Sequence, residues 1–177
     1  MTRVVQWGMG LDILSTLDFA RRDAPTTHDD LRTHLTEWLG YQRHEFVRKL
    51  RDLSPEQLVE WSVPPLELSV LGLVRHMTQM EDGYVVVGLG GGELNPRYGE
   101  DDFAGGSVDS VEADVGFHLA AVEQADQVIG SLPSLKSIGA GHGWTLAATL
   151  IKMIDEYALH AGQAHMLRFA ALGELKR

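Results

Sequence analysis

Apolar residues recur along the chain at the three-and-four spacing of amphipathic helices, over four long stretches. These stretches run from about 27 to 52, from 69 to about 88, from about 107 to 130, and from 145 to 168. The apolar face of the third is made of Val108, Val111, Val115, Leu119, Val122 and Ile129. The last has the most regular apolar face, made of Leu146, Leu150, Met153, Ile154, Tyr157, Ala161, Ala164 and Leu167. No stretch alternates cleanly with the period of two that is typical of a strand. The pattern therefore predicts an all-α helical bundle.

Capping residues mark the expected helix starts. Thr26 or Thr27 can cap the first long helix, Ser69 the second and Thr145 the fourth. The sequence SPEQ at 54–57 is a capping box with proline at the first helical position, which predicts an additional short helix.

The chain divides unevenly into two parts. Residues 1–27 have a weaker pattern, in which Leu11, Leu14 and Leu17 can line a short helix or an extension packed on the bundle. Residues 28–177 form the bundle itself. A chain of 177 residues suits one domain with its own core, and no internal repeat suggests otherwise.

Charge and composition narrow the classes of function. The formal net charge of −10 repels phosphate backbones, so we expect no nucleic-acid partner. No apolar run approaches the length that spans a bilayer, and Asp12 and Asp18 interrupt the apolar N-terminus. We therefore expect no membrane association and a cytoplasmic location. Cysteine is absent, so a metal must be bound by His, Asp or Glu, and thiol chemistry must use an external thiol.

Two ionisable side chains lie on the inward face of the fourth helix. Glu156 and His160 are four residues apart, so they lie one above the other beside apolar residues. His76 borders the inward face of the second helix. Two imidazoles and a carboxylate form a zinc-binding set, which can also hold iron, nickel or manganese. The ordinary alternatives are a solvated or hydrogen-bonded Glu–His pair and a histidine packed in the core. Among the other histidines, we expect His118 and His142 to be exposed.

Two glycine-rich segments are weaker candidates. GLGGGE at 88–93 follows a helix rather than a strand, so it does not fit a dinucleotide-binding loop. GAGHGWT at 139–145 precedes a helix and can cradle an anion, but it lacks the Lys-Ser/Thr of a P-loop. Helix termination is the more common role for both.

Three segments carry a resemblance to a known family. They are YQRHEFVRKLRDLSPEQLVEW at 41–61, LSVLGLVRHMTQME at 68–81, and GWTLAATLIKMIDEYALHAGQAHMLR at 143–168 with its E-Y-x-x-H-x-G core. In this order and spacing the chain, from about residue 28 to 170, resembles the DinB-like superfamily. Within it, the chain is similar to a branch of unknown function close to the mycothiol-dependent maleylpyruvate isomerases.

The resemblance implies a four-helix bundle of the DinB type, with short additional helices and one divalent metal between the helices. The ligands by position are His76, Glu156 and His160, which the inward-face argument also selects. Glutamate replaces the first histidine of the pair in the mycothiol-dependent branch. Gln163 stands where close relatives have histidine, which leaves the three ligands intact. Arg168 ends the motif, and it is either an anion-binding group for a cofactor or a salt-bridge partner of an acidic residue such as Glu81.

The leading functional hypothesis is therefore a metal-dependent enzyme of thiol chemistry. A zinc ion would bind a low-molecular-weight thiol, by resemblance mycothiol, and lower its pKa. The thiolate would then attack an electrophilic small molecule and be transferred to it, or would add to it reversibly and so isomerise it. The alternative is a non-catalytic metal- or small-molecule-binding protein of a stress response. By resemblance we also expect a homodimer, with Trp38, Trp61 and Tyr84 as candidate contacts.

Overall fold

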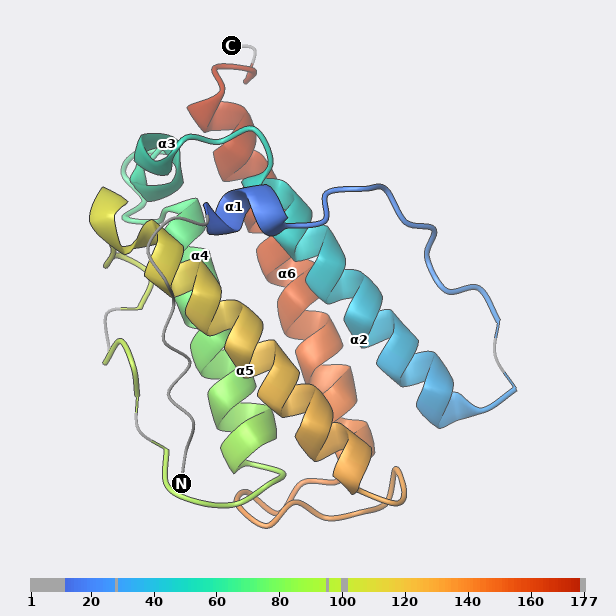
Figure 1. Cartoon of the computed structure of the whole chain (residues 1–177). Helices are drawn as coiled ribbons and strands as arrows, with labels where there is room; N and C mark the ends of the chain where they lie inside the picture. Colours follow the sequence, from blue (N-terminus) through green and yellow to red (C-terminus); the bar gives the residue numbers. More distant parts are fainter. Residues whose placement is uncertain (1–11, 28, 95, 100–101, 176–177) are drawn as a thin grey trace.

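The computed structural model describes residues 12–27, 29–94, 96–99 and 102–175. Four long helices lie side by side in it: α2 (Leu31–Val47), α4 (Val70–Met80), α5 (Val111–Ser131) and α6 (Leu146–Ala171) (Figure 1). Within the described ranges there is no β-strand, only an isolated bridge between Ile138 and Thr145. The predicted all-α four-helix bundle is confirmed. None of the described helices is both long enough and apolar enough to cross a membrane.

Short helical elements extend and connect the long ones. They are α1 (Ile13–Thr16), the 3-10 turn η1 (Arg48–Leu50), α3 (Pro55–Val59), the π-helix η2 (Glu81–Val87) and the 3-10 turn η3 (Val108–Ser110). η2 continues α4 without a break, and η3 leads into α5. The predicted short additional helices are therefore present.

Three of the predicted helix caps are confirmed and one is wrong. Ser69 and Thr145 accept backbone N–H groups at the starts of α4 and α6, and Ser54 forms the capping box of α3. The first long helix is capped by Asp30, not by Thr26 or Thr27. The Asp30 carboxylate accepts both the backbone N–H and the hydroxyl of Thr33, at 2.9 and 2.6 Å. A carboxylate also complements the positive end of the helix dipole, so α2 begins later than the apolar pattern suggested.

The described part of the N-terminal segment packs on the bundle. Four of its apolar residues are partly buried against the core: Ile13, Leu14, Leu17 and Phe19. The predicted short helix is present as α1. The backbone N–H of Ile13 donates to the Glu112 carboxylate of α5. Leu11 and the preceding residues lie outside the described part. The division at residue 27 stays a prediction.

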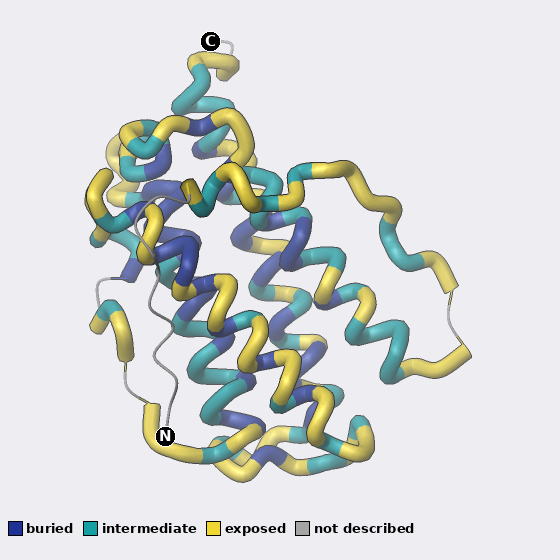
Figure 2. Tube along the Cα trace, viewed as in Figure 1, coloured by how far each residue is buried: buried dark blue, intermediate teal, exposed yellow. Residues whose placement is uncertain are grey.

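The core lies between the inward faces of the four long helices (Figure 2). The stripe of α5 differs from the prediction at one turn. Leu119, predicted to face inward, is 36% exposed, whereas His118 is 2% exposed. His118 continues the three-and-four spacing from Val111 and Val115, and its ring packs against those of Phe46 and Tyr157, with centroids 5.8 and 6.2 Å away. The expectation that His118 is exposed is therefore wrong.

A buried guanidinium joins all four long helical segments. Arg43 of α2 donates from Nε and Nη2 to the two Glu81 oxygens, both at 2.7 Å, at the start of η2. Its Nη1 reaches Asp126 of α5 at 2.6 Å. The Tyr157 hydroxyl of α6 donates to Glu81 at 2.7 Å. Burial, together with the Glu81 charge, raises the pKa of Tyr157, so the phenol keeps the proton that it donates.

His118 lies beside this network and is neutral at ordinary pH. Neither ring nitrogen has a hydrogen-bond partner among the described residues. Burial, and then the positive charge of Arg43, lower its pKa to about 3. An unfolded histidine takes up its proton near pH 6.5. Below that pH the unfolded state binds one proton more than the native state, so native stability falls as the pH drops toward 3.

We expect His118→Leu to reduce the acid sensitivity of folding. The contribution of one such histidine is about 1.4 kcal/mol per pH unit, so between about pH 6.5 and 4.5 the unfolding free energy of the variant should fall by about 2–3 kcal/mol less than that of the parent. Urea unfolding at a series of pH values measures this difference. Parallel pH profiles for the two proteins would show that His118 is protonated in the native state.

Candidate metal centre and the adjoining cavity

The fold brings the three predicted metal ligands together. His76 projects from α4, and Glu156 and His160 project from the facing side of α6. One ligand atom from each residue lies within 4.8 Å of the other two. The side chains are 12%, 13% and 7% exposed, so they are sheltered and yet reachable by a small molecule.

His76 is oriented by a loop residue. Its Nδ1 lies 2.9 Å from the Asp102 carboxylate, which can only accept, so Nδ1 carries the proton. The Nε2 lone pair is then free to bind a metal. Asp102 also accepts from Gln79 Nε2 at 2.8 Å, which holds the carboxylate in place. The Phe103 ring stacks on the His76 ring with centroids 4.0 Å apart.

Gly72 allows this loop to lie directly on α4. A Cβ at Gly72 would stand 1.8 Å from the Phe103 carbonyl oxygen, a distance that no side chain can adopt. The loop backbone therefore packs against the helix where the side chain is missing. This close approach places Asp102 and Phe103 beside His76, one helical turn further along α4.

His160 and Glu156 converge on a shared point. His160 Nδ1 lies 2.7 Å from Gln163 Oε1, an acceptor, so this nitrogen also carries a proton. His160 Nε2 faces Glu156 Oε2 at 3.2 Å. A neutral imidazole with its proton on Nδ1 would direct a lone pair at the carboxylate. The pair is therefore favourable only with a positive charge between the two atoms, either a proton or a metal ion.

The charge states of His76 and Glu156 suit metal binding. Burial lowers the pKa of His76 and outweighs the opposite effect of Asp102, which favours the neutral, ligating form. Burial alone would raise the pKa of Glu156. Lys152 and His160 lower it by more than burial raises it, so the carboxylate is ionised at neutral pH. Lys152 binds the second carboxylate oxygen of Glu156 and supplies a nearby positive charge.

Comparison with known proteins identifies the family. The family model described as Mycothiol-S-transferase matches residues 34–173. The chain belongs to this family. Membership confirms the resemblance to the DinB-like proteins and their mycothiol-related enzymes, and it indicates a thiol-transferase function related to mycothiol. No curated protein and no solved structure matches the chain.

Arg168, the remaining candidate from the family motif, lies away from the three ligands along α6. Its Nε donates to the Arg51 carbonyl at 2.9 Å and its Nη2 to Asp52 at 3.1 Å. These contacts tie the C-terminal part of α6 to the turn after η1. Arg168 therefore pairs with Asp52 and not with Glu81, whose carboxylate is bound by Arg43. The cofactor-binding role of Arg168 stays a prediction.

The glycine-rich loop before α6 is a helix terminator rather than an anion cradle. The backbone N–H groups of Ala140, Gly141 and His142 donate to the Leu89 and Gly88 carbonyls that follow η2. His142 Nε2 donates to the Tyr84 carbonyl at 3.0 Å, and its Nδ1 accepts from the Trp144 N–H at 3.1 Å. The expected exposure of His142 is only partly correct, because its ring forms part of a cavity wall.

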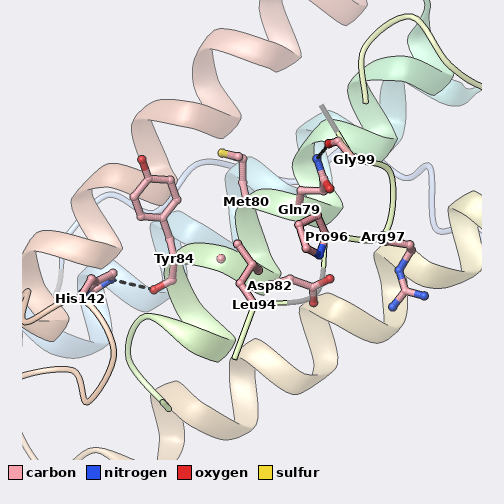
Figure 3. Close-up of a pocket in the computed structure, with 10 residues that line it drawn as sticks. Gln79, Met80, Asp82, Tyr84, Leu94, Pro96, Arg97, Gly99 and His142 are labelled. Atoms are coloured by element: carbon pink, nitrogen blue, oxygen red, sulfur yellow. Dashed lines mark hydrogen bonds between the residues drawn. The ribbon is translucent and has the colours of Figure 1, made fainter. Parts of the chain in front are cut away.

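This cavity, of about 390 Å³, lies beside the three candidate ligands but is not lined by them. Gln79 is in its wall and also holds Asp102, the partner of His76. Tyr84 is in its wall and its ring lies 5.7 Å from the Lys152 ammonium, the partner of Glu156. Figure 3 shows the lining, which consists of Gln79, Met80, Asp82, Gly83, Tyr84, Leu94, Pro96, Arg97, Gly99 and His142.

Sequence reasoning missed the groups that surround the ligands. Lys152 lies four residues before Glu156, so the helical spacing alone was enough to find that pair. Gln163, three residues after His160, was equally readable as its partner. Asp102 lies in an acidic loop without periodicity, and no pattern in the chain marks it as the partner of His76.

We expect Asp102→Asn to lower the pKa of His76 further. The carboxylate raises this pKa by its hydrogen bond and its charge, so without it burial acts alone. An NMR titration of the His76 imidazole in chelator-treated protein measures the change. Asp23→Asn makes the same replacement at an exposed position and should leave the titration unchanged. A His76 pKa that stays constant or rises in Asp102→Asn would contradict this contact.

Proposed function

We propose that this protein is a divalent-metal-dependent S-transferase, in which His76, Glu156 and His160 hold the metal. The thiol is of low molecular weight, mycothiol by family, and the acceptor is an electrophilic small molecule. The family match supports the thiol-transferase class. The absence of cysteine agrees with a thiol that comes from outside the chain.

The orientation of the two histidines is the observation that carries the proposal. Each Nδ1 is committed to an acceptor, Asp102 for His76 and Gln163 for His160. Each Nε2 is left for a ligand at the point that Glu156 also approaches. Metal-binding histidines characteristically donate their other ring N–H to such a partner, which fixes the ring and leaves the remaining nitrogen for the metal.

The donor set fits a catalytic metal. Two neutral imidazoles and one carboxylate are typical of zinc, with open positions for an exchangeable ligand, and they also suit nickel, iron or manganese. A divalent ion bound there lowers the pKa of a coordinating thiol and makes the thiolate available at neutral pH. The chain's own part is to keep Glu156 ionised, to fix the two ring orientations, and to cover one face of His76 with Phe103.

A cytoplasmic homodimer stays part of the proposal. Trp61 is 44% exposed and available for a contact between copies. Trp38 is half-buried and its ring packs on that of Tyr41, at 5.5 Å. Tyr84 lines the cavity, so it is the weakest of the three predicted contact residues.

We expect Glu156→Gln to lower metal affinity at least about tenfold, because the amide keeps the shape but loses the anionic charge beside two neutral imidazoles. Glu156→His should retain the metal, because it restores a three-nitrogen set. Metal stoichiometry after dialysis, measured by elemental analysis, compares both variants with His76→Ala, His160→Ala and the exposed control Glu123→Gln. Equal metal content in Glu156→Gln and the parent would remove Glu156 from the ligand set.

The second test concerns the reaction. We expect the zinc-loaded protein to consume a general electrophile such as monochlorobimane in the presence of at least one low-molecular-weight thiol, mycothiol first among them. The rate should fall to background after chelation and recover when zinc is added back. A panel of thiols without metal-dependent turnover would contradict the enzymatic function, even if the metal binds.

A further inference from the structure

The wall of the cavity beside the metal centre is rigid on one side. His142 uses both ring nitrogens within its own surroundings, one as a donor to the Tyr84 carbonyl and one as an acceptor from Trp144. It therefore offers a ligand only its ring. A Cβ at Gly88 would lie 2.2 Å from the His142 ring, so this ring rests directly on the helix end. The cavity is pre-formed on this side rather than closed by a free side chain.

Most of the other lining groups are either apolar or already engaged. Met80, Leu94 and Pro96 offer apolar surface. The Arg97 guanidinium is directed toward α5 in Figure 3, and it stacks 4.1 Å from the centroid of the Phe117 ring. Gln79 is bound to Asp102 and receives the Tyr98 N–H.

Asp82 is the exception. Its side chain lines the cavity, half-buried, and no described residue donates a hydrogen bond to its carboxylate. Burial raises its pKa, and the more distant Arg97 charge offsets only part of that effect. The Asp82 oxygens are not among the described side-chain atoms that are buried without a partner, so they are reachable from the cavity, where a ligand can supply the donor that the protein does not.

We propose that the cavity binds an organic ligand with an apolar body and a hydrogen-bond donor, an amine or a hydroxyl, directed at Asp82. The apolar lining takes the body, and the carboxylate selects donors and rejects anions. A mainly apolar pocket with a small number of polar groups that orient the ligand is typical of small-molecule sites. The net charge of −10 acts in the same direction, against a carboxylate ligand.

Two residues of the cavity wall are linked to the metal centre. Gln79 binds Asp102, the partner of His76. The Tyr84 ring lies near Lys152, the partner of Glu156. The ligand bound there is accordingly a reactant of the thiol transfer, a role that rests on the function proposed above. The preference for a donor at Asp82 does not depend on that function.

The test uses three probes with one apolar body: 4-phenylbutylamine, 4-phenylbutanol and 4-phenylbutyrate. In chelator-treated protein we expect the amine to bind about tenfold more tightly than the acid, with the alcohol between them. The ammonium group is attracted by the Asp82 carboxylate, whereas the carboxylate of the acid is repelled by it. Calorimetry gives the affinities, and NMR shifts of the Gly83 and Gly99 amides locate the site. An acid that binds as tightly as the amine would overturn the proposal.

Two variants and one control sharpen this result. Asp82→Asn should reduce amine affinity to about that of the alcohol, while Asp109→Asn, the same replacement at an exposed site, should leave it unchanged. Gly83→Leu should weaken all three probes, because the new side chain has open space to enter beside the cavity. Circular dichroism checks that each variant is folded. An amine affinity that neither Asp82→Asn nor Gly83→Leu lowers would place the amine elsewhere and overturn the proposal.

A final measurement separates this inference from the proposed function. In the zinc-loaded protein the amine should compete with a reactant of the thiol transfer, and Asp82→Asn should weaken this inhibition by the same factor by which it lowers amine affinity. Active enzyme that the bound amine does not inhibit would overturn the cavity's role in the reaction. Asp82-dependent amine binding in a protein with no transferase activity would instead contradict the proposed function and leave the cavity's ligand preference standing.

Discussion

The arrangement of the helices depends on one buried guanidinium. An unpaired charge in a core is strongly unfavourable, so the position of Arg43 is acceptable only while Glu81, Tyr157 and Asp126 surround it. Those partners come from η2, α6 and α5. Removing one of these groups would leave a buried charge without its full set of partners. The network therefore permits only a narrow range of positions for the helices that carry it. The rotation of α6 that directs Tyr157 at Glu81 also sets the directions of Glu156 and His160, which lie on the adjacent side of the same helix.

The π-helix η2 connects this network to the cavity. Glu81, its first residue, points into the core, whereas Asp82, Gly83 and Tyr84 line the cavity. The wider turn is visible in the hydrogen bond from the Gly88 N–H to the Gly83 carbonyl, five residues back, at 3.0 Å. A π-turn rotates the following side chains relative to those of α4, and such turns are frequent at functional sites. The buried ion pair, the cavity wall and the candidate metal centre are thus parts of one continuous helical segment and its partners.

The candidate centre is organised by its outer contacts as much as by its ligands. Asp102 and Gln163 determine which nitrogen of each imidazole carries the proton, and Lys152 keeps a positive charge beside Glu156. Two of these groups belong to α6 itself, and the third reaches His76 from a loop that rests on Gly72. The same Gln79 that steadies Asp102 forms part of the cavity, so a ligand in the cavity would touch a residue that is linked through Asp102 to His76.

The sequence by itself determined the features that depend on near neighbours along the chain. Helical periodicity predicted the four long helices, the SPEQ capping box predicted α3, and the four-residue spacing placed Glu156 and His160 on one face. No local rule relates residues on different helices, so the pairing with His76 came from the expected inward faces of the bundle and from the family resemblance. Only the tertiary structure decided that Arg43 takes Glu81, that His118 is buried, that Arg168 binds Asp52 and that Asp102 orients His76. Each of these features depends on the packing together of segments far apart in sequence, which periodicity along a single helix does not register.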